Sequence, residues 1–234
     1  KANLVWDLQD QKVSLGRFGW KAGEPNIRQQ SSKAFKGDIG ISSPLTILPW
    51  GDCTSKQQKC RNAPNGNTPT QNNLEISPEA MDKLVFYSQN LAVPARRDID
   101  KPEVLAGKKL FYETGCVKCH RPKFVTKRLP DQPEQSFQLI WPYSDLLLHD
   151  MGEGLADQRP EGLASGSEWR TPPLWGIGLT ETVNGHTQFL HDGRARNLLE
   201  AILWHGGEAE IIKQNFLKFN SKKRSEMLAF LNSL

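Results

Sequence analysis

The feature that most constrains this chain is the pentapeptide Cys116-Val117-Lys118-Cys119-His120. It has the C-x-x-C-H pattern of covalent haem attachment, in which each thiol adds to a vinyl group of the macrocycle and the His ligates the iron. A zinc site needs four ligands, and the remaining cysteines do not supply them at a familiar spacing. A thioredoxin-like redox pair is less favoured still. The motif therefore predicts one covalent haem c on Cys116 and Cys119, with His120 as an axial ligand.

The other two cysteines, Cys53 and Cys60, lie in a polar loop between Pro49 and Pro64. Such a pair is typical of a disulfide, which needs an oxidising compartment, and two free thiols are the alternative. Haem c is also attached outside the bacterial cytoplasm, so both features predict a periplasmic or extracellular protein. Residues 1–4 lack the apolar segment of a signal peptide, which indicates a processed or engineered chain.

Composition excludes two other classes of protein. The 234 residues are 37% hydrophobic, and no apolar run reaches the length of about 18 residues that a membrane-spanning helix needs. The 30 basic and 26 acidic side chains give a net charge of only +4, so nucleic-acid binding is not indicated. The 15 prolines and 19 glycines predict many turns and long loops.

Local patterns predict a mainly α-helical fold with long loops. Helices are expected over 27–35, over 77–91 with Ser77 as N-cap, over 103–114 ending at Gly115, over 197–205 and over 221–234. A helix directly before the attachment motif is typical of small c-type cytochromes, and the loop over 121–188 is expected to wrap the haem. Residues 96–234 are therefore predicted to form a cytochrome c-like domain.

The first 95 residues contain few periodic runs but one weak internal likeness. Residues 18–30 resemble residues 192–201 once a gap of two residues is allowed. If the likeness is a repeat, residues 1–95 are the tail of a partial second cytochrome c-like domain whose own attachment motif precedes Lys1.

Five further motifs resemble those of a known family. They are GRFGWKA at 16–22, LLLHDMG at 146–152, RTPPLWG at 170–176, FLHDGR at 189–194 and AILWHGG at 201–207. Together they resemble the C-terminal half of the di-haem oxidoreductases, also described as thiol oxidoreductases, which are related to bacterial di-haem cytochrome c peroxidases. Members carry two C-x-x-C-H motifs, whereas this chain has one. The resemblance therefore implies a missing N-terminal haem domain as a partner.

The resemblance also implies a function. In the peroxidase relatives the N-terminal haem meets peroxide, whereas the C-terminal haem is six-coordinate and passes electrons. This chain is then expected to carry the electron-transfer haem, served by a redox partner protein or a small-molecule electron donor, with no complete peroxidase activity of its own. A free-standing mono-haem electron carrier and an open-faced peroxidase haem are the alternatives. Calcium, which occurs between the domains of the peroxidase relatives, is a further expectation without assigned ligands.

The sixth iron ligand is expected to be a His or a Met. In the peroxidase relatives it follows the His of the His-Asp-Gly turn by fourteen residues, as Met or Tyr, and the residue fourteen positions after His191 is His205. The resemblance thus implies a bis-His haem of low potential, although His205 could instead only stabilise the end of its helix. Met151 is the alternative ligand, at a spacing from His120 that small cytochromes use. Less favoured candidates are His149, His186, His191, Met81 and Met227, and both of these methionines are expected in helix cores.

Two further roles concern the surroundings of the haem. Arg170 and Arg194, within the resembling motifs, are candidates to pair with the haem carboxylates, and the alternative is that they are ordinary surface arginines. Trp20 and Trp175 are candidates to line an electron route between haems, although packing in a core is the commoner role of a buried Trp.

Overall fold

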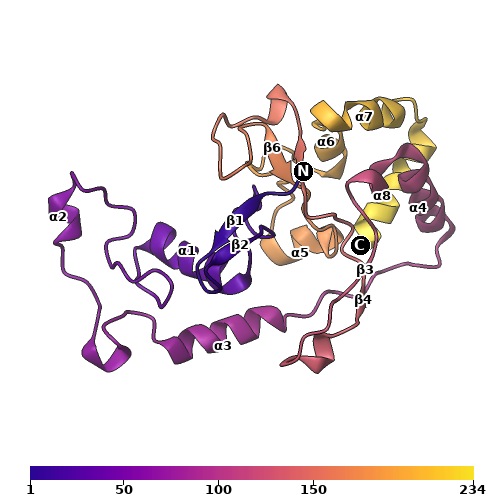
Figure 1. Ribbon diagram of the computed structural model, residues 1–234. Coiled ribbons are helices and arrows are strands. Elements are labelled where there is room, and N and C mark those ends of the chain that lie inside the picture. Colours follow the sequence, from indigo (N-terminus) through magenta and orange to yellow (C-terminus); the bar gives the residue numbers. More distant parts are fainter. The chain divides into compact units, whose positions relative to one another are not determined.

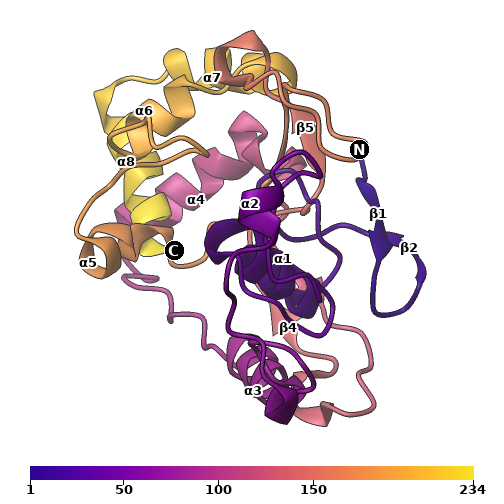
Figure 2. The ribbon, with the colours of Figure 1, turned by 90° about the vertical axis from the view of Figure 1, so that its left-hand side faces the viewer.

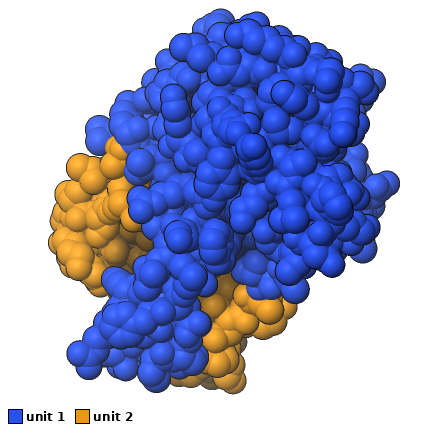
Figure 3. All heavy atoms as spheres, turned by 90° about the vertical axis from the view of Figure 1, so that its right-hand side faces the viewer, with its two compact units in different colours: residues 1, 93–234 blue, residues 2–92 orange.

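The computed structural model describes residues 1–234 and divides into two compact units (Figures 1 and 3). One unit comprises residues 2–92, and the other comprises residues 93–234 together with Lys1. None of the helices combines the length and the apolar character needed to cross a bilayer.

The unit of residues 2–92 begins with an antiparallel hairpin and continues with three helices. The hairpin pairs β1 (Leu4–Asp7) with β2 (Lys12–Leu15), and the helices are α1 (Ile27–Ile39), α2 (Gln58–Arg61) and α3 (Pro78–Gln89). Helix α1 extends beyond the predicted 27–35 and ends at Gly40, whose φ of 69° is readily adopted by glycine. Helix α3 begins as predicted, because the Ser77 side chain accepts a hydrogen bond from the Ala80 N–H.

The predicted disulfide between Cys53 and Cys60 is present in this unit. The first cysteine precedes α2 and the second lies within it. Cys116 and Cys119, in the other unit, are joined neither to each other nor to this pair. The division of the four cysteines into a disulfide and a separate pair is therefore confirmed.

Asn26 joins the hairpin to α1. Its side-chain oxygen accepts from the Gln29 N–H at 2.8 Å, and its amide nitrogen donates to the Asp7 carboxylate at 3.0 Å. We expect Asn26→Ala to lower the free energy of unfolding by about 1–2 kcal/mol, because it removes both the cap and the link. Asn26→Ser keeps a capping oxygen and should recover part of the loss in urea unfolding. Equal stability of all three proteins would contradict this role.

The unit of residues 93–234 contains five helices and two further hairpins. The helices are α4 (Pro102–Thr114), α5 (Thr180–Asn184), α6 (Leu198–Leu203), α7 (Glu210–Leu217) and α8 (Ser221–Ser233). The antiparallel pairs are β3 (Phe124–Val125) with β4 (Leu139–Ile140), and β5 (Leu148–Asp150) with β6 (Glu168–Arg170). Five turns of 3-10 helix lie over Cys116–Lys118, Pro133–Gln135, Glu153–Leu155, Ile177–Leu179 and Gly207–Ala209, and a sixth, Pro69–Gln71, belongs to the other unit.

The core of this unit forms where α4 and α8 cross (Figures 1 and 2). A Cβ at Gly107 would lie 1.9 Å from the Glu226 carbonyl oxygen, so the two backbones meet at this glycine. Beside the crossing, the rings of Phe111 and Phe230 are 5.2 Å apart and both contact Tyr143. This aromatic group supports the segment that follows α4, which contains the attachment motif.

The prediction of a mainly α-helical fold is wrong. Helix accounts for 39% of the residues when the 3-10 turns are included, and strand accounts for 12% when isolated β-bridges are included. The structure has eight α-helices and three two-stranded sheets. The strands are only two to four residues long, too short for an alternating pattern to stand out in sequence. The helix predicted over 197–205 is also shorter, at Leu198–Leu203, and α7 was not predicted.

Candidate haem site

The attachment motif is positioned by the end of α4. Gly115, with φ of 100°, ends the helix in a left-handed turn, and Cys116–Lys118 then form one turn of 3-10 helix. Burial raises the pKa of the Cys116 thiol to about 12. Neither Cys116 nor Cys119 is part of a disulfide, so both sulfurs are available for covalent attachment.

His120 presents a free ring nitrogen. Its Nδ1–H donates to the Tyr143 carbonyl oxygen at 3.0 Å, which leaves Nε2 with its lone pair. Burial, together with the proximity of His205, lowers the pKa of His120 to about 4. A neutral imidazole held through one nitrogen to a backbone carbonyl is the form in which histidine binds a metal through the other.

His205, which follows α6, is held in the same way. Its Nδ1–H donates to the Ala201 carbonyl oxygen at 2.7 Å, and burial lowers its pKa. The ring centres of His120 and His205 are 6.4 Å apart. A metal–imidazole bond is about 2.0–2.1 Å long and the nitrogen lies about 1.1 Å from its ring centre, so two rings on opposite sides of one ion have centres about 6.3 Å apart. The observed ring-centre distance is therefore close to the value for two imidazoles that bind one iron from opposite sides.

Three glycines bring the His205 segment against the segment that follows β5. A Cβ at Gly207 would lie 2.3 Å from the Asp150 carbonyl oxygen, and one at Gly206 would lie 2.9 Å from that of Met151. A Cβ at Gly152 would lie 2.9 Å from the Gly207 nitrogen. The motifs at 146–152 and 201–207 therefore pack backbone to backbone, which explains why both contain glycine.

Met151, the alternative ligand, lies in this contact. Its N–H donates to the Ser167 carbonyl oxygen at 3.0 Å, and its own carbonyl oxygen faces Gly206. The backbone of Met151 is therefore placed beside the segment that carries His205. It stays the alternative to His205 as a ligand.

His149 is engaged through both ring nitrogens. Nε2 lies 2.8 Å from the Asp145 carboxylate, and Nδ1 lies 2.8 Å from Glu208 and 3.5 Å from the Cys119 sulfur. With no nitrogen free, His149 does not fit an axial ligand. Asp145 and Glu208 were not among the predicted site residues, because Glu208 is 59 positions from His149 and because Asp145, four positions from His149, lies outside every predicted helix.

The remaining His and Met candidates lie elsewhere in the structure. Met81 and Met227 are 0% and 1% exposed, so the expectation that both are core residues is confirmed. His186 is an exposed residue whose Nδ1 accepts from the Gln188 N–H. The His191 ring stacks on that of Trp169, with centres 3.6 Å apart.

The two arginines predicted to meet the haem carboxylates have different surroundings. Arg170 ends β6, and burial lowers its pKa. Arg194 donates to Asp192 and to the Gly154 carbonyl oxygen, and its guanidinium lies 4.9 Å from the centre of the Trp204 ring. Arg194 is therefore engaged by these groups, and the buried Arg170 guanidinium donates to the Thr171 carbonyl oxygen at 3.3 Å.

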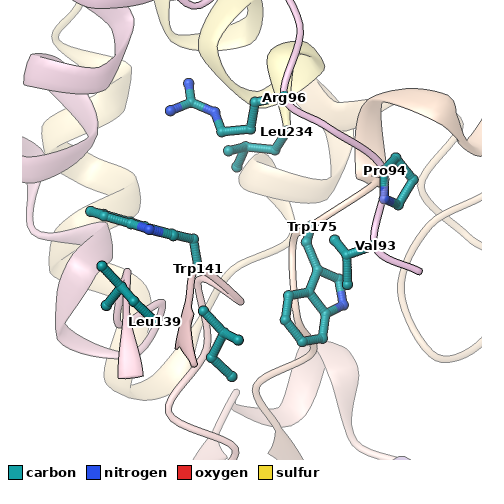
Figure 4. A pocket seen from close by; sticks show the side chains of 8 residues that line it. Val93, Pro94, Arg96, Leu139, Trp141, Trp175 and Leu234 are labelled. Atoms are coloured by element: carbon teal, nitrogen blue, oxygen red, sulfur yellow. The ribbon is translucent and has the colours of Figure 1, made fainter. Parts of the chain in front are cut away.

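A small apolar pocket of about 270 Å³ has neither His120 nor His205 in its lining (Figure 4). It is lined by Val93, Pro94, Arg96, Leu139, Ile140, Trp141, Trp175 and Leu234. Of the two tryptophans that are candidates to line an electron route, Trp175 borders this pocket and Trp20 is 51% exposed. The structure has no group of three or more His, Cys, Asp or Glu side chains arranged to hold a metal ion, and the calcium expectation has no ligand set here.

Comparison with known proteins gives one finding of similarity. A protein-family model described as "Di-haem oxidoreductase, putative peroxidase" matches residues 1–234, the whole chain. No curated protein matches the chain.

Proposed function

Because this chain belongs to the di-haem oxidoreductase family, as its motifs predicted, we propose that residues 93–234 form an electron-transfer unit of a haem oxidoreductase. The family establishes haem as the cofactor and oxidoreduction as the chemistry. One covalent haem c in this unit, and its role in relaying electrons, are our proposal.

The proposal assigns each residue a part in holding that haem. Cys116 and Cys119 attach it through thioether bonds, and His120 and His205 bind its iron from opposite sides. Arg170 is proposed to pair with a haem carboxylate, because its guanidinium is desolvated and a carboxylate is the group it would bind best. When bound, the haem supplies one-electron redox chemistry, and ligation by two imidazoles without methionine favours a low potential.

The separation of the His120 and His205 rings carries the proposal. Both imidazoles keep the proton on Nδ1, because a backbone carbonyl accepts it, and both present Nε2. Their ring centres are 6.4 Å apart, the separation expected of two imidazoles on one iron, and an iron bound by both would have no free axial position for peroxide. We therefore propose that substrate oxidation or peroxide reduction takes place at a second haem, outside residues 1–234, and that this unit exchanges electrons with it.

We also propose a periplasmic or extracellular location. The Cys53–Cys60 disulfide supports this location, since disulfides persist in oxidising compartments. The electron donor is proposed to be a redox protein or a small molecule.

Replacing His205 tests the proposed iron coordination. The ferric wild-type haem should be low-spin, and His205→Ala should make it high-spin and open to cyanide, as seen in visible and electron paramagnetic resonance spectra. Met151→Leu is the matched control and should keep the low-spin spectrum. A high-spin wild-type protein, or a methionine charge-transfer band that Met151→Leu abolishes, would contradict the proposal.

A further inference from the structure

His149 links two segments that lie far apart in the sequence. On one side its Nε2 contacts Asp145, and on the other its Nδ1 contacts Glu208, both at 2.8 Å. The His149 side chain is 15% exposed and that of Asp145 is 12% exposed, so this half of the bridge is sheltered from water. A hydrogen bond to a charged group in such a place contributes more than one on the surface.

The Asp145 end of the bridge is fixed to the haem-attachment motif. The Asp145 N–H donates to the Cys119 carbonyl oxygen at 2.9 Å, and one carboxylate oxygen accepts from the Leu147 N–H at 2.9 Å. Nδ1 of His149 also lies 3.5 Å from the Cys119 sulfur. His149 is therefore in direct contact with the second attachment cysteine.

The Glu208 end of the bridge is fixed to the segment that follows α6. Glu208 lies three residues after His205, and its second carboxylate oxygen accepts from the Asp150 N–H at 3.1 Å. The intervening Gly206 and Gly207 give this short segment little side-chain packing of its own. Its position therefore depends on its backbone contacts and on Glu208.

The charges of the bridge favour the same arrangement. Hydrogen bonds with Asp145 and Glu208 raise the pKa of His149 against the opposing effect of burial. Each ring nitrogen lies 2.8 Å from one carboxylate oxygen, and this geometry suits an imidazole that donates from both nitrogens.

We propose that His149 is a positioning residue, which fastens the segment carrying His205 to the haem-attachment segment by bridging Asp145 and Glu208. This inference rests on the proposed function in one respect, because the fastening matters to redox chemistry only if His205 binds the iron. The bridge itself is independent of that ligation. Two measurements on the haem-loaded protein therefore separate the two questions.

The experiment compares three single variants with the wild type. His149→Gln and Glu208→Ala each break the bridge, and His186→Gln replaces an exposed histidine of the same unit as a matched control. The first measurement is amide hydrogen exchange over residues 205–210. The second is the rate of carbon monoxide binding to the reduced haem, which rises as the sixth ligand dissociates more readily.

We expect both bridge variants to accelerate exchange and carbon monoxide binding about tenfold, which corresponds to about 1.4 kcal/mol, with His186→Gln unchanged. The double variant His149→Gln/Glu208→Ala should have an effect smaller than the sum of the two single changes, because the His149–Glu208 contact is lost in both, although each single change also removes one contact of its own. Glu208 is 53% exposed, so its variant leaves no buried cavity and keeps the test valid should His149→Gln fail to fold.

The two measurements can give three results, each of which supports or overturns the role of His149. Unchanged exchange over 205–210 in either bridge variant, or simple additivity in the double variant, would overturn the role of His149. Accelerated exchange together with accelerated carbon monoxide binding supports it. If the bridge variants accelerate exchange but the wild-type iron already binds carbon monoxide without delay, the bridge is supported. His205 is then refuted as the axial ligand.

Discussion

Replacing Cys116 and Cys119 together by alanine should abolish covalent haem. Each thioether bond needs one of these sulfurs, and neither is used in a disulfide. In a host that matures c-type haem, we expect the double variant to lose essentially all pigment resistant to acidified acetone. The measurement is the absorbance that stays with the polypeptide after this extraction.

The matched control is the other cysteine pair. Cys53→Ala/Cys60→Ala removes the disulfide but should keep the covalent haem, since that pair lies in the other unit. A single replacement of Cys116 or Cys119 should leave one thioether and an intermediate yield. Pigment that resists extraction in the double Cys116/Cys119 variant would refute the assignment of the attachment site.

Gly107→Ala should strongly destabilise the unit of residues 93–234. The new Cβ would lie 1.9 Å from the Glu226 carbonyl oxygen and 2.8 Å from the Cβ of Phe230, so α4 and α8 would have to separate. We expect a loss of about 3 kcal/mol or more in the free energy of unfolding, at the upper end of the cost of overpacking a core. Urea unfolding followed by circular dichroism measures the loss.

A second glycine inside a helix provides the contrast. At Gly37 in α1, the nearest heavy atom to a new Cβ is an Asp52 carboxylate oxygen at 3.6 Å, an ordinary contact. Gly37→Ala should therefore stabilise its unit by about 0.5–1 kcal/mol through helix propensity. If Gly107→Ala were equally harmless, the close crossing of α4 and α8 would be wrong.

The sequence was informative where a local pattern determines the structure. Ser77 with Pro78, and Gly115 after the apolar face of its helix, predicted helix ends that the structure contains. The hairpins were missed, because their strands have only two to four residues, and β3 and β4 are in addition paired across a long loop. A mainly helical fold was therefore predicted from the part of the chain with readable periodicity.

The residues of the candidate site were likewise predictable only where a local sequence motif contains them. The cysteines and His120 follow from one contiguous motif, whereas His205 was singled out only through a family resemblance. By itself, His205 indicated a helix end, and the structure shows that its Nδ1–H does bond a carbonyl of α6. That hydrogen bond also leaves Nε2 free, so the structural role and the proposed ligand role require the same contact. The bridge through His149 joins residues too distant for any local pattern to reveal.

The contact among Gly152, Gly206 and Gly207 has a consequence for how such a centre can diversify. With no space for a Cβ between the two segments, the backbone at this point cannot shift to accommodate larger neighbours. Under the proposed ligation by His205, an exchange of that side chain would act within a backbone frame that the three glycines hold in place. Redox tuning at this centre is therefore expected to proceed more readily by exchanges at position 205 than by movement of the backbone around it.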